Sequence, residues 1–448
     1  MKAGPSQEEI RQHNLGALLR HVHLGGPTSR ADLATRMGLN RSTILALVND
    51  LTAAGLVREE LPQVTGRAGR PSLVVRPVAT RAHVLALDVG VERLTAALIG
   101  LGGVFLDRRE CAWSPERPQD PAEVADILAE YADDVLSAAP AGGSCVGVAV
   151  AVRGIVRHPD GLVSLTPNMG WKDVDLAAEL SGRLHLDVPV PVLVANEANL
   201  GALAEHRRGG GRGSQNLIYL HGEIGIGAGI VVDGELLRGG RGYAGEIGHI
   251  TVNPHRGRPC GCGAHGCLEA EAGERALLEA AGRDPRVTGA GAVRAVVTAA
   301  DLGDVTARAA LHRVGDWLGI GIGTLANLFN PDLIVFGGTL RDVYLGSAAQ
   351  VRSRVNTSAL FACREHLRLR VSELGGDAIL IGAAELAFSE LLARPLETLS
   401  PHAEEGAPIP RGSRRGQLAV NPLPLEPADH GNDPGHGPGV RAGLGLDR

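Results

Sequence analysis

Residues 245–273 bring together the side chains of this sequence that are best suited to bind a metal ion. One histidine and three cysteines follow the spacing H-x10-C-x-C-x4-C, at His249, Cys260, Cys262 and Cys267. Three thiolates and one imidazole fill a closed tetrahedral Zn²⁺ shell, which leaves no position for a reactive water. We therefore expect a structural zinc ion here. The alternative, a loop of reduced cysteines without metal, requires a chance cluster of a rare residue.

Two acidic residues flank the expected metal site and extend its chemistry. Glu246 precedes His249 by three residues, and Glu269 follows Cys267 by two. A metal-bound imidazole still presents its second ring nitrogen as a donor, in an orientation that the metal fixes. Neighbouring sugar hydroxyls each donate and accept hydrogen bonds, so two carboxylates and one N–H suit them. The sequence therefore predicts a polyol-binding site formed by Glu246, His249 and Glu269.

The composition describes the protein that must position these residues. The chain has 448 residues, enough for several domains, and it is 44% hydrophobic with only 3% aromatic residues, so its cores must be aliphatic. The polar N-terminus lacks the order of a signal peptide, and no apolar run is long enough to span a bilayer. We expect a cytoplasmic protein without membrane contact, in which the cysteines stay reduced and available to a metal.

Residues 1–78 have the pattern of a winged helix-turn-helix domain. Three helices with N-cap candidates such as Ser29 and Asn40 precede two strand-like runs, which flank the loop TGRAGR. This part contains ten Lys and Arg against six Asp and Glu, although the whole chain has a formal net charge of −6. A basic head on an acidic body is typical of a protein whose head contacts a polyanion. We expect double-stranded DNA; a helical protein-interaction or dimerisation module is the alternative.

The expected DNA contacts lie mainly on the third helix and on the wing. Asn, Arg, Ser and Thr can bond base edges or phosphates, and Leu45, Val48 and Leu51 would form the buried face of the helix. Arginines on an extended, glycine-rich loop can enter an A·T-rich minor groove, although such arginines are often merely solvated. The predicted DNA-binding residues are Ser29, Arg30, Asn40, Arg41, Ser42, Thr43 and Asn49 in the helical part and Arg67 and Arg70 in the wing.

Beyond the head the sequence alternates between strands and helices. Runs rich in β-branched residues or leucine end in Gly, Asp or Asn, and helical stretches separate them. This alternation predicts an α/β fold with a mixed or parallel sheet covered by helices in residues 79–395. From residue 396 to residue 448 the content of proline, glycine and charge rises and periodicity is lost, so we expect a disordered C-terminal tail.

The stretch AGEIGHITVNPHRGRPCGCGAHGCLEA resembles the signature of the ROK family of repressors and sugar kinases. The resemblance covers nearly all of residues 12–395, and GPTSRADLATRMGLNRSTILALVNDLTAAGLVRE followed by GRAGRPS is similar to the DNA-binding head of the repressor branch. It implies an actin-like ATPase (ribonuclease H-like) fold with two lobes, a hinge near residues 196–200 and a sugar cleft between the lobes. It also implies zinc at the four ligands named above, and a homodimer or homotetramer, which suits a two-fold operator. The implied sugar contacts are Asn168, Asn196, Glu197, Glu246, His249 and Glu269.

Two departures from the kinase pattern of this family bear on whether the protein is a sensor or an enzyme. The resemblance implies a phosphate loop D-x-G-x-T, but DVGVERL has Glu92 where threonine belongs, and a carboxylate there would repel phosphate. The base position holds Glu197, in NEAN, instead of aspartate, and a displacement of about 1 Å there can cost on the order of 100-fold in rate.

We therefore expect no catalytic residue and no enzyme activity. The expected function is that of a DNA-binding repressor of carbohydrate metabolism genes that responds to a sugar or sugar phosphate. Two alternatives stay open: an active ATP-dependent sugar kinase with an accessory DNA-binding head, and a repressor that a protein partner controls.

Overall fold

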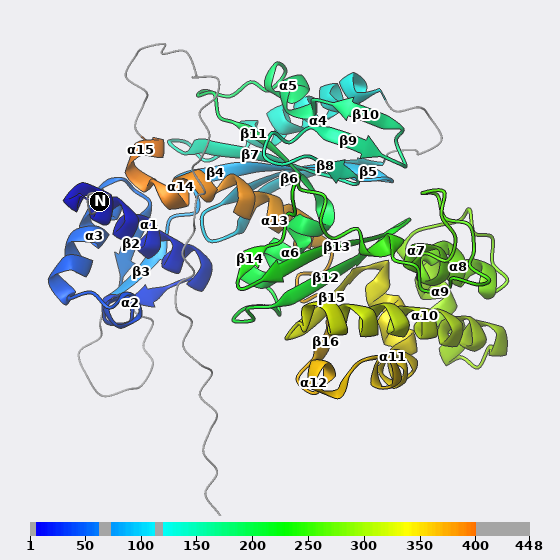
Figure 1. Ribbon diagram of the computed structural model, residues 1–448. Coiled ribbons are helices and arrows are strands. Elements are labelled where there is room, and N and C mark those ends of the chain that lie inside the picture. The colour runs from blue at the N-terminus through cyan, green and yellow to red at the C-terminus, as the bar shows by residue number, and fades with distance from the viewer. Residues whose placement is uncertain (1–5, 62–72, 113–119, 400–448) are drawn as a thin grey trace, which may run out of the picture. The chain divides into compact units, whose positions relative to one another are not determined.

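The computed structural model describes residues 6–61, 73–112 and 120–399 of the chain, and Figure 1 shows their helices and strands. Arg67 and Arg70, the predicted wing contacts, lie outside the described residues. None of the helices in the described part of the chain is both long enough and apolar enough to cross a membrane.

The N-terminal head contains three helices and a small sheet, as the sequence predicts. Its elements are α1 (Gln7–Gly25), β1 (Thr28–Ser29), α2 (Arg30–Met37), α3 (Arg41–Ala53), β2 (Val57–Glu60) and β3 (Val74–Pro77). Ser29 and Asn40 are the N-caps of α2 and α3, and Gly38 ends α2 in the left-handed conformation that favours glycine. β2 and β3 form an antiparallel hairpin, and β1 pairs with the outer edge of β3. The head is therefore a winged helix-turn-helix.

Two five-stranded sheets with the same strand order form the body of the protein (Figure 1). The first sheet contains β4 (Ala82–Val89), β5 (Arg93–Gly100), β6 (Val104–Ala112), β7 (Ser144–Val152) and β11 (Val192–Asn196). The second contains β12 (Leu217–Gly222), β13 (Ile226–Val232), β14 (Glu235–Leu236), β15 (Leu333–Gly338) and β16 (Arg368–Val371). In each sheet three consecutive strands form an antiparallel meander, and two later strands extend it in parallel from the first strand. This repeat confirms the predicted two-lobed, actin-like architecture.

A small third sheet lies in the first lobe. It contains β8 (Ile155–Val156), β9 (Val163–Thr166) and β10 (Trp171–Val174), and helix α5 (Leu176–Ser181) follows it. The turn between β9 and β10 includes Asn168, one of the predicted sugar contacts.

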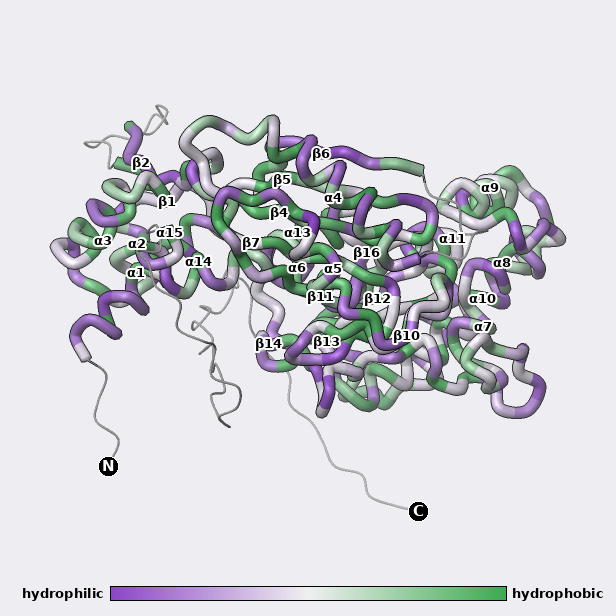
Figure 2. Tube along the Cα trace, turned by 90° about the horizontal axis from the view of Figure 1, so that it is seen from above, coloured by the Kyte–Doolittle hydropathy of each residue, from purple (hydrophilic) through white to green (hydrophobic). Residues whose placement is uncertain are grey.

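Both faces of the first sheet are buried, because alternate residues of a strand point to opposite sides. Leu85 and Leu87 of β4 belong to the core that includes α4 (Pro121–Ser137), whereas Val84 and Ala86 belong to the core that includes α13 (Ala378–Ala387). Figure 2 shows the apolar residues concentrated along central strands such as β4 and β5.

The second sheet is also covered on both faces. Ile218 and Leu220 of β12 pack with the long helices α10 (Val305–Phe329) and α11 (Thr339–Ser358), and Leu217 and Tyr219 pack with α6 (Glu197–Arg207). The shorter helices of this lobe are α7 (Leu268–Ala272), α8 (Glu274–Ala280), α9 (Ala290–Asp301) and α12 (Phe361–Arg364). Because α6 packs on the second sheet, α13 on the first, and the two helices on each other, this helix pair joins the lobes.

The C-terminal helices return to the head. α14 (Ser389–Ala393) and α15 (Pro395–Leu399) share one apolar core with α1, to which Leu391 and Leu392 contribute buried side chains. Leu396 and Leu399 pack against the same core, so residues 396–399 belong to the folded part of the chain. The predicted start of the tail at residue 396 is therefore too early. The helix has only five residues and is followed by a segment rich in proline and charge, so its two leucines do not form a recognisable apolar pattern in the sequence.

Candidate functional site

The four predicted metal ligands converge on one point. The ligand atoms of His249, Cys260, Cys262 and Cys267 all lie within 4.8 Å of one another. Cys262 Sγ is 3.7 Å from Cys267 Sγ, and Cys260 Sγ is 3.6 Å from His249 Nδ1. A tetrahedral ion with a Zn–S bond of about 2.3 Å and a Zn–N bond of about 2.0–2.1 Å requires separations of about 3.8 Å and about 3.6 Å. The four side chains can therefore hold a tetrahedrally coordinated metal ion.

Buried contacts around the loop keep these ligands in place. Glu271 is buried and accepts hydrogen bonds from the Arg258 backbone N–H at 2.8 Å and from Asn253 Nδ2 at 3.0 Å. Gly266 has a φ of 73°, and a Cβ atom at this position would lie only 1.9 Å from the Asn253 carbonyl oxygen. The backbone of the loop thus closes so tightly that only glycine fits between its two branches.

Two carboxylates, Glu246 and Glu269, lie close to the metal ligands, and a third, Glu197, interacts electrostatically with Glu246. Glu197 begins α6, Glu246 begins the short 3₁₀ turn that contains His249, and Glu269 lies in the first turn of α7. Glu269 accepts a hydrogen bond from the Ile226 backbone N–H at 3.1 Å. Glu246 and His249 are exposed, Glu269 is half-buried and Glu197 is buried, so the group offers several accessible polar atoms beside a dry interior.

The pKa values of Glu197 and Glu246 are both raised. Burial raises the pKa of Glu197 to about 8, against the opposing effect of Arg153 and with a contribution from Glu246. Desolvation also raises the pKa of Glu246, an effect that Glu269 strengthens and His249 weakens. At neutral pH the Glu197 carboxyl is therefore mostly protonated, and it can donate a hydrogen bond as well as accept one.

The structure revises the role predicted for Asn196. Its side-chain oxygen accepts hydrogen bonds from the backbone N–H groups of Ala198 and Asn199, and its Nδ2 donates to the Gly154 carbonyl and to Glu197 Oε2. These four bonds use the full capacity of an amide side chain. Asn196 therefore caps α6 and orients Glu197, and it has no group left for a sugar hydroxyl.

Asn168 lines a hollow between the lobes. It is exposed, and the hollow, of about 500 Å³, is also lined by Val91, Ile224 and Arg275. Val91 and Asn168 belong to the first lobe, whereas Ile224 and Arg275 belong to the second. This hollow therefore opens between the lobes, on the side of the phosphate-loop sequence DVGVERL.

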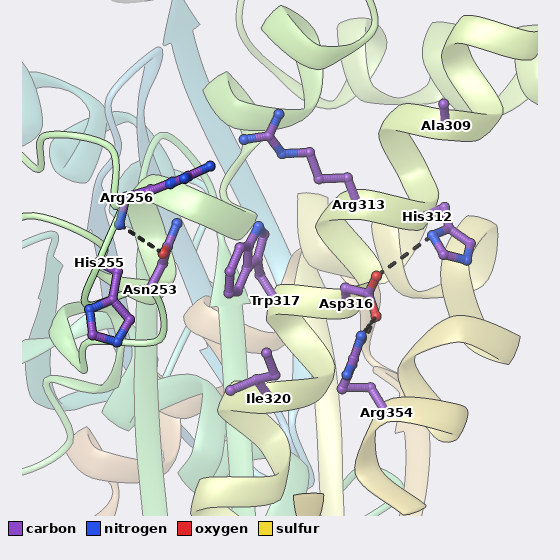
Figure 3. Close-up of a pocket in the computed structure, with 10 residues that line it drawn as sticks. All are labelled: Asn253, His255, Arg256, Ala309, His312, Arg313, Asp316, Trp317, Ile320 and Arg354. Carbon is purple, nitrogen blue, oxygen red and sulfur yellow. Dashed lines mark hydrogen bonds and ion pairs between the residues drawn. The ribbon is translucent and has the colours of Figure 1, made fainter. Parts of the chain in front are cut away.

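A second hollow, of about 550 Å³, lies on the second lobe (Figure 3). Trp317 and Ile320 of α10 form its floor, and the side chain of Arg256 reaches over it from the metal loop. Asp316 pairs there with Arg354 at 2.6 Å and with His312 at 3.6 Å. None of the predicted sugar contacts lines this hollow, so it is separate from the acidic group.

Sequence reasoning missed the cation at the centre of the two lobes. Arg153, which follows β7, forms a bidentate ion pair with Asp88 of β4, and its Nε donates to Glu223 Oε2 at 2.8 Å. Burial raises the pKa of Asp88 despite Arg153, whereas the guanidinium lowers the pKa of Glu223 although burial alone would raise it. Asp88, at the end of β4, belongs to the first lobe, and Glu223, directly after β12, belongs to the second, so Arg153 ties the lobes together between the phosphate-loop sequence DVGVERL and the turn that joins β12 to β13.

The head presents only some of its predicted DNA contacts. Arg41, Ser42 and Asn49 are exposed on α3, and Thr43 is half-buried beside them. Asn40 and Ser29 use their side-chain oxygens as N-caps. Arg30 pairs with Glu59 at 3.0 Å, which leaves Arg41 as the exposed cation at the start of α3.

The buried face of α3 differs from the predicted one. Ile44 and Leu47 are buried with Val48 and Leu51, whereas Leu45 is 40% exposed. Leu45 therefore lies on the outer face, near Ser42 and Asn49, where an apolar group can contact a thymine methyl.

Comparison with known proteins places this arrangement in a family. The profile of the ROK family matches residues 84–390, and that of the MarR family matches residues 16–68, within the head. The chain belongs to the ROK family. The xylose repressor of Bacillus subtilis is 29% identical over 388 residues, which cover 86% of this chain and 97% of the relative.

Two further ROK relatives span the two activities of the family. The crystal structure of a ROK transcriptional regulator, a homologue of the Escherichia coli MLC protein, matches with a TM-score of 0.70 and 27% identity over 87% of this chain and 99% of that one. The glucokinase of Halalkalibacterium halodurans is 31% identical over 316 residues, which cover 67% of this chain and 94% of the enzyme. The relatives that extend over the head are thus regulators, and the kinase matches the ROK domain.

Proposed function

We propose that this ROK protein is a transcriptional repressor whose affinity for an operator depends on a sugar bound in the ROK domain. The observation that supports this most strongly is the union, in one chain, of a winged helix-turn-helix head with a ROK domain whose acidic side chains gather beside a Cys₃His cluster. A sugar between the lobes would stabilise the lobe arrangement that binds it more tightly. If the two lobe arrangements differ in their affinity for the operator, sugar binding changes the Kd for DNA.

We assign zinc to His249, Cys260, Cys262 and Cys267. Three thiolates and an imidazole at tetrahedral separations are a typical set of ligands for structural zinc. When bound, the ion would fix the imidazole ring and the backbone of the loop, and would leave no open position for catalysis. His249 Nδ1 faces the cluster, so the other ring nitrogen is available to a sugar hydroxyl.

The sugar would bind through Glu197, Glu246, His249 and Glu269, with Asn168 across the hollow between the lobes. The acidic group offers carboxylate acceptors, and protonated Glu197 adds a donor next to them. Alternating donors and acceptors are what adjacent hydroxyls require. In this proposal Asn196 acts indirectly, by holding Glu197 in place.

The same geometry argues against phosphoryl transfer. Arg153 occupies the space between Asp88 and Glu223, at the two loops that would have to surround nucleotide phosphates. Glu92 adds an exposed carboxylate to the first of these loops. Glu197, at the position of the general base, is one methylene longer than the aspartate of the kinase pattern, and a displacement of about 1 Å there can cost on the order of 100-fold in rate.

DNA binding would involve two heads on a two-fold operator, so we propose that the active form is a homodimer or homotetramer. Arg41, Ser42, Thr43 and Asn49 would contact the major groove from α3, and the wing arginines, Arg67 and Arg70, would contact the minor groove. The capping roles of Ser29 and Asn40, and the ion pair of Arg30, place these three residues in support of the helices.

A selection from a random pool of duplex DNA with the full-length protein tests the proposal. The selected duplex would then be titrated with protein in the presence of d-xylose, d-glucose, N-acetyl-d-glucosamine and their phosphates. We expect at least one of these compounds to change the Kd for DNA, and Glu269→Gln to abolish the change while Glu130→Gln, at an exposed position on α4, preserves it. If no compound changes DNA affinity, the sugar-sensing function is refuted, and sugar-dependent ADP release in a coupled assay would establish the kinase alternative instead.

A further inference from the structure

A buried histidine lies where the head meets the ROK domain. His23, in the last turn of α1, has a completely buried side chain. Its Nε2 is 3.0 Å from Glu385 Oε1, and its Nδ1 accepts a hydrogen bond of 2.9 Å from the Gly102 backbone N–H. Gly102 lies in the turn between β5 and β6, and Glu385 lies on α13, so one imidazole joins three elements.

Arg208 competes for the same ring nitrogen. Its Nη2 lies 2.6 Å from His23 Nε2, its Nη1 donates to the Gly102 carbonyl at 3.0 Å, and its Nε pairs with Glu385. Burial lowers the pKa of His23, so the ring is neutral and has one N–H and one lone pair. With Nδ1 accepting from Gly102, Nε2 carries the proton and can bond Glu385, but it cannot also accept from Arg208. The neutral imidazole can therefore bond only two of its three neighbours, Gly102, Glu385 and Arg208, at one time.

The other end of this contact reaches the predicted sugar site. Arg208 directly follows α6, and α6 begins at Glu197, the buried acid of the sugar group. An eleven-residue helix spans about 16 Å at 1.5 Å per residue, so α6 connects Glu197 at the sugar site to Arg208 at the junction through one short helix. Helix α13, which holds Glu385, packs tightly against it: a Cβ atom on Gly382 would lie 1.9 Å from the Leu200 carbonyl oxygen. A displacement of α6 would therefore move Arg208 and Glu385 together.

We propose that α6 and α13 transmit the state of the sugar site to the DNA-binding head through the His23, Arg208 and Glu385 junction. This inference rests on the proposed sugar-dependent repressor function and names the path of its regulation. A sugar that shifts Glu197 displaces the end of α6, and the hydrogen bonds of His23 redistribute between Glu385 and Arg208. Because His23 is on α1, whose residues pack against α3, the redistribution changes the orientation of the recognition helix.

The main alternative is that the junction only stabilises the contact between the head and the ROK domain. A purely structural contact affects stability and DNA affinity, but it does not affect the ratio of DNA affinities with and without sugar. This ratio is therefore the quantity to measure. Allosteric ratios of this kind are typically about 5- to 150-fold.

Two variants remove the junction and one matched variant leaves it intact. His23→Leu keeps an apolar side chain of similar size and deletes both hydrogen bonds of the ring. Arg208→Gln with Glu385→Gln removes both charges at once, which avoids an unpaired buried ion. His21→Leu is the control, because His21 lies on the same helix and its Nε2 has no hydrogen-bond partner among the described residues.

The experiment compares full-length proteins with the selected duplex as DNA probe. The ligand probe is whichever of d-xylose, d-glucose, N-acetyl-d-glucosamine and their phosphates raises the Tm of the wild type. In wild type and His21→Leu we expect the sugar to change the Kd for DNA by the full ratio. In His23→Leu and in the double variant we expect the sugar still to raise the Tm and DNA still to bind, but the ratio to fall below about 2-fold.

A ratio that stays at the wild-type value in folded junction variants overturns the inference, while the proposed repressor function stands. A wild type that shows no sugar effect on DNA affinity overturns the proposed function itself, and the inference with it. Hydrogen exchange of the wild type provides a test that needs no variant. Sugar must change amide exchange at the end of α6 and in the last turn of α1, and exchange confined to the sugar site would contradict the path.

Discussion

Replacement of Glu197 by glutamine tests the protonation state that the proposed sugar site assigns to this buried acid. Burial raises the pKa of this carboxyl from 4.5 to about 8. Below pH 4.5 the group is protonated in the folded and the unfolded chain, so it does not affect stability. Between pH 4.5 and about 8 only the unfolded chain ionises, and the folded state is progressively penalised. Glutamine is similar in shape and has no such penalty.

The expected magnitude follows from this interval. At about 1.4 kcal/mol per pH unit, the full interval corresponds to about 5 kcal/mol. The free energy of unfolding of Glu197→Gln, minus that of the wild type, should therefore rise steadily from pH 5 to pH 8 and level off above pH 8. The sign is opposite to that of a salt-bridged acid, whose replacement costs most stability at high pH.

Urea unfolding followed by circular dichroism, at each pH unit from 5 to 9, measures this difference. Other titrating groups contribute equally to both proteins and cancel in the subtraction. Glu130→Gln, an exposed substitution on α4, should give a flat difference over the same range. A flat difference for Glu197→Gln as well would show that the carboxyl is ionised in the folded protein, and would refute its assignment as a hydrogen-bond donor to the sugar.

Three further outcomes are expected. Metal analysis of the purified protein should find about one zinc per chain, which Cys267→Ser loses and Cys363→Ser retains, and a metal-free, fully folded wild type would contradict the assignment. Gly16→Ala should lower the free energy of unfolding by about 1–3 kcal/mol, because a Cβ would lie 2.5 Å from the Leu392 carbonyl oxygen where α1 meets α14. Gly291→Ala, at an open position in α9, should raise the free energy of unfolding slightly, and urea unfolding measures both changes. Arg41→Ala should weaken binding to the selected duplex and reduce the salt dependence of the Kd by about one unit of slope, and an unchanged slope would place Arg41 away from the phosphates.

The head shows how far local signals reach. Cap residues such as Ser29, Gly38 and Asn40 mark helix ends by local chemistry, so the sequence predicts the three helices and the hairpin. The buried face of α3 was predicted incorrectly at Leu45. That helix has more apolar residues than one face can hold, and only packing against α1 decides which of them stays exposed.

Two strands at sheet edges, β6 and β16, were not predicted. β6 contains the charged run 107–110, and β16 alternates Arg368 and Arg370 with apolar residues, so neither is the continuous apolar run that marks a buried strand. The central strands, whose residues are buried on both faces, read as continuous apolar runs and were predicted. The fold class was thus accessible from the sequence, whereas the order of the strands came only from the structure.

The candidate site divides in the same way. The metal ligands and two of the acids lie within one short segment, so their spacing reveals them. Arg153 gave no such signal, because its partners Asp88 and Glu223 are 65 and 70 residues away along the chain. Asn196 carried a misleading signal, since the same side chain can cap a helix or bind a ligand, and only its hydrogen-bond partners distinguish the two.

Arg153 also explains how a fold shared with sugar kinases can act as a sensor. Asp88 and Glu223 come from the two loops that face each other between the lobes, and without a cation their charges would repel across that space. In this structure the guanidinium of Arg153 pairs with both carboxylates. These ion pairs connect the first lobe to the second. In the proposed path the binding energy of a sugar shifts α6 against α13, and His23 of the DNA-binding head contacts both Glu385 of α13 and Arg208 at the end of α6.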